Sequence, residues 1–303
     1  MGTRVYHIRP RVRMVSVWRE IAACTATRIH GHCSINNCRS RILAMTRSAL
    51  PNLLHMQSLS VVRKYELDIA LKYFPEATSS QPSRLLELGA GTGQQAKYLT
   101  DRGYQVLAID LPSSSYKEAR VFPVVDYDGK NIPAPEGEFD VVFSSNVLEH
   151  VKSIDTVLAE TYRILKPTGC AIHIIPSPTC RIWSIPAHYV WLARRIIARL
   201  AATFSQRKTT VPRTPQSGKE WAGTILPLRH GERGNTLTEI YYFSQTYWSG
   251  KLEAHGFKVE RIIGNGIFYT MANAVGTHLP LKHRETLSGI LGSSCLIYIA
   301  TKN

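Results

Sequence analysis

The stretch that most constrains the fold is a short apolar run that ends in three alternating glycines. The run covers residues 85–88 and includes Glu87, and Gly89, Gly91 and Gly93 follow it. It predicts a buried strand that breaks into a tight turn, because glycine adopts left-handed backbone conformations at little steric cost. The residues after the turn have helical composition. We therefore expect the turn to present backbone N–H groups to a ligand at the start of a helix.

A second apolar run, residues 105–109, follows and ends at Asp110. A strand, a glycine turn, a helix and a second strand that ends in a carboxylate form a nucleotide-binding βαβ unit, in which the carboxylate lies near ribose hydroxyls. Together with Ala96, the glycines also satisfy the relaxed pattern of dinucleotide-binding proteins. Glu87 argues against a dinucleotide, because its carboxylate would repel a pyrophosphate but attract an ammonium group.

The stretch from Glu87 to Gly93 resembles motif I of class I S-adenosylmethionine (SAM)-dependent methyltransferases, and residues 84–176 resemble the methyltransferase type 11 domain. Residues 138–151 extend the resemblance, because they are similar to the fourth strand of that family and to the Leu-Glu-His that begins its next helix. The resemblance implies an α/β fold, Rossmann-like and doubly wound, with a mostly parallel seven-stranded sheet and an antiparallel last strand. It also implies an enzyme that uses SAM as its methyl donor.

The resemblance further implies where SAM would bind. The methionine end would lie against the glycine turn, the ribose at Asp110, and the adenine at Asp126 with help from the backbone N–H of Tyr127. Asp126 has a second interpretation, as the start of an Asp-Tyr-Asp-Gly turn. The cofactor residues that we predict are Glu87, Gly89, Ala90, Gly91, Gly93, Asp110, Leu111, Asp126, Tyr127 and Asn146.

Two histidines are candidate general bases, since imidazole is the usual acceptor of a proton from a hydroxyl nucleophile. His150 begins the helix after the fourth predicted strand, which places it beside the SAM pocket, but it could equally form the pocket wall or a cap. His230 lies in residues 228–235, where such methyltransferases carry their substrate cover. It could instead orient the substrate or complete a turn. A carboxylate acceptor would need neither base.

The acceptor is only coarsely indicated. Residues 228–235 resemble methyltransferases of bacterial polysaccharide and glycolipid synthesis, which implies a small-molecule acceptor such as a sugar, a glycolipid or a lipid-linked compound. DNA is disfavoured, because residues 144–147 read Ser-Ser-Asn-Val where enzymes that methylate exocyclic amines of DNA bases usually carry Asn/Asp-Pro-Pro-Tyr/Phe.

The charge distribution suggests a basic N-terminal extension, residues 1–58, before a methyltransferase domain over residues 59–303. Residues 1–60 hold nine Arg, no Lys and one acidic residue, within a chain of net charge +15. Three interpretations stay open: an over-extended gene model with a true start at Met45 or Met56, a targeting segment, or a basic binding arm. The arm would suit an RNA-directed methyltransferase, which is the first alternative function.

A substrate-cover insertion is expected at about residues 177–240. Within it, residues 189–204 form an amphipathic helix with arginines opposite an apolar face. The apolar face could pack on the domain, lie on an anionic membrane surface, or help to grip a phosphorylated substrate. A non-catalytic, methyltransferase-like protein at a membrane surface is therefore the second alternative function.

The six cysteines indicate free thiols in a reducing compartment, because no secretory signal precedes them. We therefore expect a cytoplasmic protein, with peripheral membrane contact and organelle targeting as alternatives. No metal is predicted. Cys33 and Cys38 lie near His30 and His32, but their spacing matches none of the structural zinc patterns.

Overall fold

The computed structural model describes residues 59–77, 82–204, 225, 227–270 and 279–303, except for the side chains of residues 198, 199 and 201–204. The chain divides into two compact units, residues 1–61 and 62–303. The sheet and the candidate site lie in the second unit. The predicted N-terminal extension and the cysteine and histidine group within it lie outside the described residues.

Seven strands form one sheet in the order β3-β2-β1-β4-β5-β7-β6. All neighbouring pairs are parallel except those of β7, which runs antiparallel to both β5 and β6. The predicted fold class, a mostly parallel seven-stranded sheet with an antiparallel last strand, is confirmed. The strands are β1 (Arg84–Leu88), β2 (Gln105–Asp110), β3 (Val125–Asp126), β4 (Phe139–Ser145), β5 (Leu165–Pro176), β6 (Phe257–Gly264) and β7 (Cys295–Lys302).

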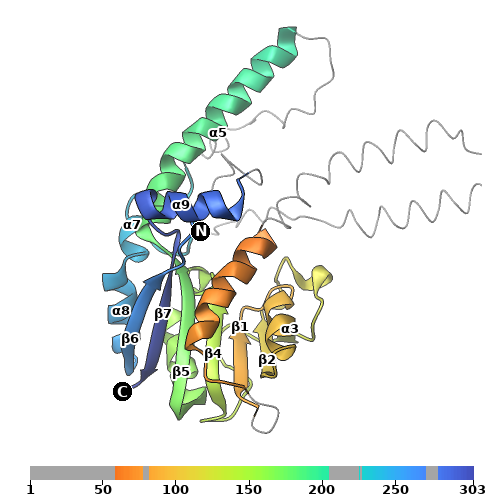
Figure 1. The fold of residues 1–303 in the computed structure, drawn as a ribbon, viewed down its shortest axis with the longest axis vertical. Coiled ribbons are helices and arrows are strands. Elements are labelled where there is room, and N and C mark those ends of the chain that lie inside the picture. Colours follow the sequence, from red (N-terminus) through yellow and green to blue (C-terminus); the bar gives the residue numbers. More distant parts are fainter. Residues whose placement is uncertain (1–58, 78–81, 205–224, 226, 271–278) are drawn as a thin grey trace, which may run out of the picture. The chain divides into compact units, whose positions relative to one another are not determined.

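Helices cover both faces of this sheet (Figure 1). The first described helix runs over residues 59–70 and continues as the 3-10 turn η1. The helical elements after it are, in chain order, η1 (Leu71–Tyr73), α3 (Gln94–Thr100), η2 (Lys117–Ala119), η3 (Leu148–His150), α4 (Ile154–Ile164), α5 (Pro178–Phe204), α7 (Glu239–Tyr242), α8 (Gln245–Glu253) and α9 (Leu281–Leu291).

The alternation of side chains along β1 explains the two helical layers, because successive residues of a strand face opposite sides of the sheet. Leu85 packs on one face with Leu67 and with Leu99 of α3. Leu86 packs on the other face in the cluster that contains the buried residues of α4 and Trp248 of α8. Both faces of the strand are therefore buried, as expected for a central parallel strand.

The third strand is shorter than its sequence suggests. An apolar run over residues 121–126 predicts a full strand, but only Val125 and Asp126 pair with β2. Pro123 interrupts the run and has no N–H for a ladder, and the N–H of Val121 donates instead to the carbonyl oxygen of Thr92 in the glycine turn. The Lys-Pro-Thr-Gly sequence at residues 166–169 predicts a turn, but these residues already belong to β5, which begins at Leu165.

α5 begins eleven residues earlier than the predicted amphipathic segment. Its first turns pack into the domain, where Cys180, Arg181 and Ser184 are buried. Further along, Val190 and Ile197 are 52% and 65% exposed. No helix in the described part of the chain combines the length and the apolar character that a membrane crossing requires.

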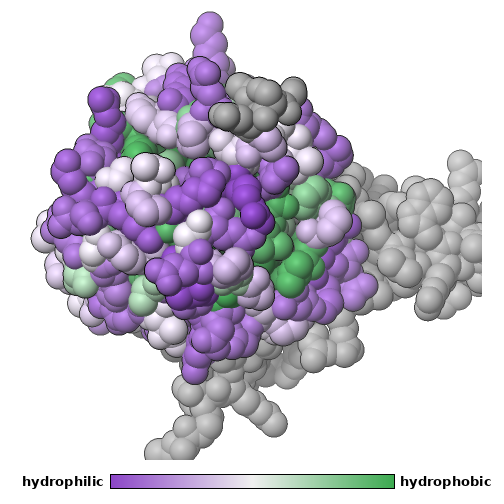
Figure 2. Space-filling view, turned by 90° about the horizontal axis from the view of Figure 1, so that it is seen from below, coloured by the Kyte–Doolittle hydropathy of each residue, from purple (hydrophilic) through white to green (hydrophobic). Residues whose placement is uncertain are grey.

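The two ends of the parallel strands differ in character. At the amino ends, seen from below Figure 1, the described surface is mostly hydrophilic with a smaller apolar area (Figure 2). Ion pairs lie here, such as the one between Lys166 and Asp140 at 2.8 Å. The glycine turn and the residues after β4 lie at the opposite, carboxyl ends, where ligands bind in open α/β sheets.

Candidate functional site

The glycine turn adopts a backbone that only glycine accepts without strain. The φ angles of Gly89, Gly91 and Gly93 are 70°, 56° and 75°, all in the left-handed region. A Cβ atom on Gly89 would lie 2.5 Å from a methyl group of Val147, and one on Gly93 would lie 2.7 Å from the Cβ of Phe122. Neighbouring segments therefore close on the turn from two sides and fix its path.

Asp110 binds the same turn from the end of β2. Its Oδ2 accepts a hydrogen bond of 3.1 Å from the N–H of Gly91, and its Oδ1 accepts one of 2.8 Å from the N–H of Leu111. The carbonyl oxygen of Ile109 also accepts bonds from the N–H groups of Gly89 and Ala90, at 2.8 and 3.0 Å. The structure thus brings together the predicted methionine and ribose residues.

Glu87 supplies a buried carboxyl group beneath the turn. Its side chain is 3% exposed, and its Oε2 has no hydrogen-bond partner among the described residues. Burial raises the pKa of Glu87 to about 8; the Ala96 N–H works against this shift, and Asp110 adds to it. Such a carboxyl group is matched by a ligand that brings its own positive charge.

Asp126 and Tyr127 lie at the expected edge of the sheet but are engaged differently. Asp126 is in register with Asp110, yet its carboxylate pairs with Lys117 and, at 2.8 Å, with Arg120. Hydrogen bonds from these cations lower its pKa. The N–H of Tyr127 donates to the carbonyl oxygen of Asp110 at 3.0 Å. The N–H of Tyr127, predicted to help bind an adenine, is therefore already used in a hydrogen bond within the sheet.

Asn146 follows β4 in a strained conformation. Its φ is 56°, the one left-handed non-glycine residue within the described ranges. The Sγ of Cys295 donates to its Oδ1 at 3.5 Å, and the next residue, Val147, is the one that closes on Gly89. Strain of this kind is concentrated at functional sites, and the predicted role of Asn146 in cofactor binding stays a prediction.

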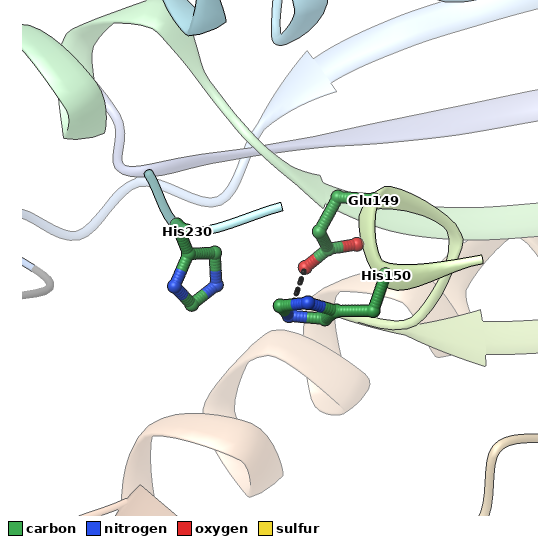
Figure 3. A group of neighbouring side chains, drawn as sticks. All are labelled: Glu149, His150 and His230. Carbon is green, nitrogen blue, oxygen red and sulfur yellow. Dashed lines mark ion pairs between the residues drawn. The ribbon is translucent and has the colours of Figure 1, made fainter. Parts of the chain in front are cut away.

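A second group of side chains forms just beyond β4. Glu149 and His150 come from η3, and His230 approaches them from a segment about eighty residues later (Figure 3). Their ligand atoms all lie within 4.8 Å of one another, and the two imidazole ring centres are 4.6 Å apart. The carboxyl group of Glu149 is buried, whereas 43% of the His150 side chain is exposed.

A buried ion pair holds His230 in this position. The N–H groups of His230 and Gly231 donate to one carboxylate oxygen of Glu239, at 2.7 and 2.5 Å. The other oxygen of Glu239 lies 3.1 Å from the Nε of Arg181. The adjacent N–H of Glu232 donates to the carbonyl oxygen of Glu149 at 2.9 Å. The loop is thereby fixed against η3.

Comparison with known proteins identifies a family for one segment of the chain. Residues 86–173, which contain the glycine turn, Asp110, Asn146 and η3, match the family described as "Methyltransferase domain". Residues 86–173 are a methyltransferase domain. The match confirms the predicted class I SAM-dependent methyltransferase family for that segment, with SAM as its methyl donor.

Curated relatives align with the methyltransferase domain over part of their length. The chain is 29% identical over 119 residues to a malonyl-[acyl-carrier protein] O-methyltransferase from Enterobacter lignolyticus, covering 38% of this chain and 46% of that protein. It is 29% identical over 96 residues to a ubiquinone biosynthesis O-methyltransferase from Rhodopseudomonas palustris, covering 29% and 38%. The chain thus spans less than half the length of these relatives.

Solved structures resemble the chain more distantly. A SAM-dependent methyltransferase from Mesorhizobium loti has 18% sequence identity and a TM-score of 0.47, covering 78% of this chain and 97% of the other. At that distance the likeness adds no weight to the family assignment, which rests on the sequence match.

Burial shifts the pKa values of all three residues in the second group. Burial raises the pKa of Glu149 to about 8. Loss of hydration lowers the pKa of His150 and of His230, and for His230 the neighbouring imidazole and Arg63 add to the effect. His230 as a whole residue is nevertheless exposed. Both imidazoles are neutral at pH 7.

Sequence reasoning missed Glu149, Glu239 and Arg181 as members of this site. Glu149 was part of the Leu-Glu-His resemblance but was not expected to face His230. The Arg181–Glu239 pair left no pattern in the sequence, since its members are 58 positions apart in regions without a motif. A buried acid and a buried base at 1–2% exposure are visible only once the chain is folded.

Proposed function

We propose that this chain transfers a methyl group from SAM to an oxygen or nitrogen nucleophile of a small molecule. The observation that carries the proposal is the glycine turn with Asp110 bound to it. It joins three left-handed glycines, a strand-end carboxylate and the unpartnered oxygen of Glu87 at one edge of the sheet.

These residues suit the cofactor that the family implies. Glu87 would attract the ammonium group of the methionine portion, and Asp110 keeps lone pairs for ribose hydroxyls beyond its two backbone bonds. Gly89 and Gly91 would let that portion approach the backbone closely. When bound, SAM would supply an electrophilic methyl group on its sulfonium, and the protein's main task would be to position the acceptor in line with it.

At the adenine end of the proposed site, both predicted groups already have partners within the protein. Asp126 could still accept from an amino group through a remaining lone pair, since its side chain is 33% exposed. The Tyr127 N–H is already bonded. Leu111, 41% exposed beside Asp110, offers an apolar surface for a planar base.

An oxygen nucleophile is the favoured acceptor. Both relatives described above are named as O-methyltransferases, and His150 and His230 are neutral imidazoles able to accept a proton from a hydroxyl group. Their lowered pKa values weaken them as bases, so a carboxylic acid, which is ionised at pH 7, is the acceptor that needs least help. Sugars, glycolipids and lipid-linked compounds stay within the proposed class.

The test is a methyl-transfer assay that follows S-adenosylhomocysteine release with a panel of carboxylic acids, hydroxylated sugars, phenols and amines. We expect turnover with at least one oxygen acceptor and none in Asp110→Ala. Binding of S-adenosylhomocysteine without turnover across the panel would favour the non-catalytic alternative. Turnover with RNA that is lost when residues 1–55 are deleted would favour the RNA-directed alternative.

A further inference from the structure

We propose that Glu149, His150 and His230 form a binding site for a divalent first-row transition-metal ion such as Zn²⁺. The three residues come from two segments that fold against each other, and their ligand atoms lie within 4.8 Å of one another (Figure 3). The inference does not depend on methyl transfer, and it departs from the sequence analysis, which predicted no metal.

The unsatisfied carboxyl group of Glu149 is the independent observation that points to a ligand. The residue is 1% exposed, and its carboxyl oxygens have no hydrogen-bond partner in any other described residue; only the N–H of Glu149 itself acts on them. Its nearest charged or chargeable neighbour is the Nε2 of His150, at 3.7 Å, which is too far for a hydrogen bond. Buried polar groups are nearly always paired, so an unpaired carboxyl group needs an explanation.

The donor set fits a metal ion better than it fits an organic cation. Two neutral imidazoles and one carboxyl group, which would release its proton as the metal binds, are ligands that Zn²⁺ and its neighbours accept, with positions left for water or substrate. At bond lengths near 2.1 Å, tetrahedral ligands are about 3.4 Å apart. The present separations of up to 4.8 Å would need to contract by up to about 1.4 Å, within reach of side-chain rotation.

The backbone around the site restricts such movement to the side chains. A Cβ atom on Gly231 would lie 2.8 Å from the carbonyl oxygen of Glu149, so the two segments are in close contact. Glu239 fixes the backbone of His230 as described above. His150 has room to rotate, since 43% of its side chain is exposed.

Nearby guanidinium groups do not remove the attraction for a cation. Arg63 pairs with the buried Glu66 at 2.7 Å, which offsets its charge. Arg233 directs its donors to the carbonyl oxygens of Leu148 and Val151. Glu232 acts on His150 in the opposite sense to Arg63. The site therefore faces both signs of charge, with the carboxyl group of Glu149 innermost.

A metal ion here would lie beyond the carboxyl end of β4, next to the segment that closes on Gly89. If the proposed function holds, the open coordination positions would face the acceptor, and the ion would bind an acceptor oxygen and lower its pKa. That would activate the acceptor without requiring either histidine to act as the base.

The test measures metal binding directly, with the full chain freed of metal by chelation. Calorimetric titration with ZnCl₂, and the visible spectrum of the Co²⁺ form, would be recorded for the wild type and for Glu149→Gln, His150→Gln and His230→Gln. The matched control is His283→Gln, which changes an exposed histidine of α9. Circular dichroism and S-adenosylhomocysteine binding would verify that each variant is folded.

We expect one ion per chain in the wild type and the control, and an affinity at least ten-fold weaker in each site variant. A Cys33→Ser/Cys38→Ser variant separates this site from the other group of ligand-type residues, and it should bind as the wild type does. Absence of Zn²⁺ binding by folded wild type, unchanged affinity in the site variants, or loss of the ion in the double cysteine variant would each overturn the proposal. None of these outcomes depends on turnover.

Discussion

The N–H of Gly91 donates a hydrogen bond of 3.1 Å to Oδ2 of Asp110, which ties the turn after β1 to the end of β2. One carboxylate therefore serves two purposes in this account. It shapes the glycine turn through the backbone, and we propose that its remaining lone pairs accept from a ribose.

Asp110→Asn should weaken both roles of this side chain. The amide keeps one oxygen acceptor but presents a donor to the second backbone N–H, and it loses the charge; charge-assisted hydrogen bonds contribute about 1.5–3 kcal/mol. We expect S-adenosylhomocysteine to bind about ten-fold or more weakly, with a loss of about 1–3 kcal/mol in the free energy of unfolding. Asp126→Asn is the control and should weaken binding less, because that carboxylate already pairs with two cations. Equal losses in the two variants would contradict this assignment.

The three glycines should differ in their tolerance of alanine. Gly89→Ala places a Cβ 2.5 Å from Val147, whereas Gly91→Ala places one at 3.4 Å from the Tyr116 ring, an ordinary contact. Both substitutions pay about 1–2 kcal/mol for the left-handed backbone, and only Gly89→Ala adds a steric clash. We expect urea unfolding to show a clearly larger loss of stability in Gly89→Ala. Within the folded chain the steric constraint is therefore tighter at Gly89 and Gly93 than at Gly91.

The pH dependence of stability should carry the signature of Glu87. Burial raises its pKa to about 8 from an ordinary value of 4.5. The native state therefore binds more protons than the unfolded state between these values, and this contribution to stability declines as pH rises through that window. Glu87→Gln removes the contribution. We expect wild type to lose stability relative to Glu87→Gln between pH 5 and pH 8 in urea titrations. A constant difference between the two proteins would show that Glu87 titrates normally.

The Arg181–Glu239 pair should stabilise the His230 loop. Arg181→Met leaves the carboxylate of Glu239 buried without its cation, and loss of one partner of a buried pair costs about 3–5 kcal/mol. In the double variant Arg181→Met/Glu239→Gln no charge is left, and an amide oxygen still accepts from the N–H groups of His230 and Gly231. We expect the double variant to be more stable than Arg181→Met in chemical unfolding. A double variant less stable than Arg181→Met would contradict the claim that an unpaired buried carboxylate of Glu239 causes the loss of stability.

The central strands could be predicted because their signals are local. Residues 85–88 and 105–109 are apolar runs next to glycine or a carboxylate, and both form the expected strands. β3 could not be predicted in full, because Val121 bonds to Thr92 of the glycine turn rather than to a neighbouring strand. That competition depends on the folded path of the turn.

The candidate site was predictable to the same degree. Glu87 and Asp110 lie near the same edge of the sheet because parallel strands bring their carboxyl ends together. The partner of Asp126 was not predictable, since Lys117 and Arg120 belong to a connection without a sequence pattern. His150 and His230 were each predicted as a base, but their contact rests on a buried ion pair between distant residues.

The most direct test is calorimetric titration of the full chain with S-adenosylhomocysteine, with NAD and a short RNA as controls. The account predicts micromolar binding of S-adenosylhomocysteine, loss of that binding in Asp110→Ala, and no comparable binding of NAD. A folded chain that does not bind S-adenosylhomocysteine, or that binds it equally well in Asp110→Ala, would contradict the central claim.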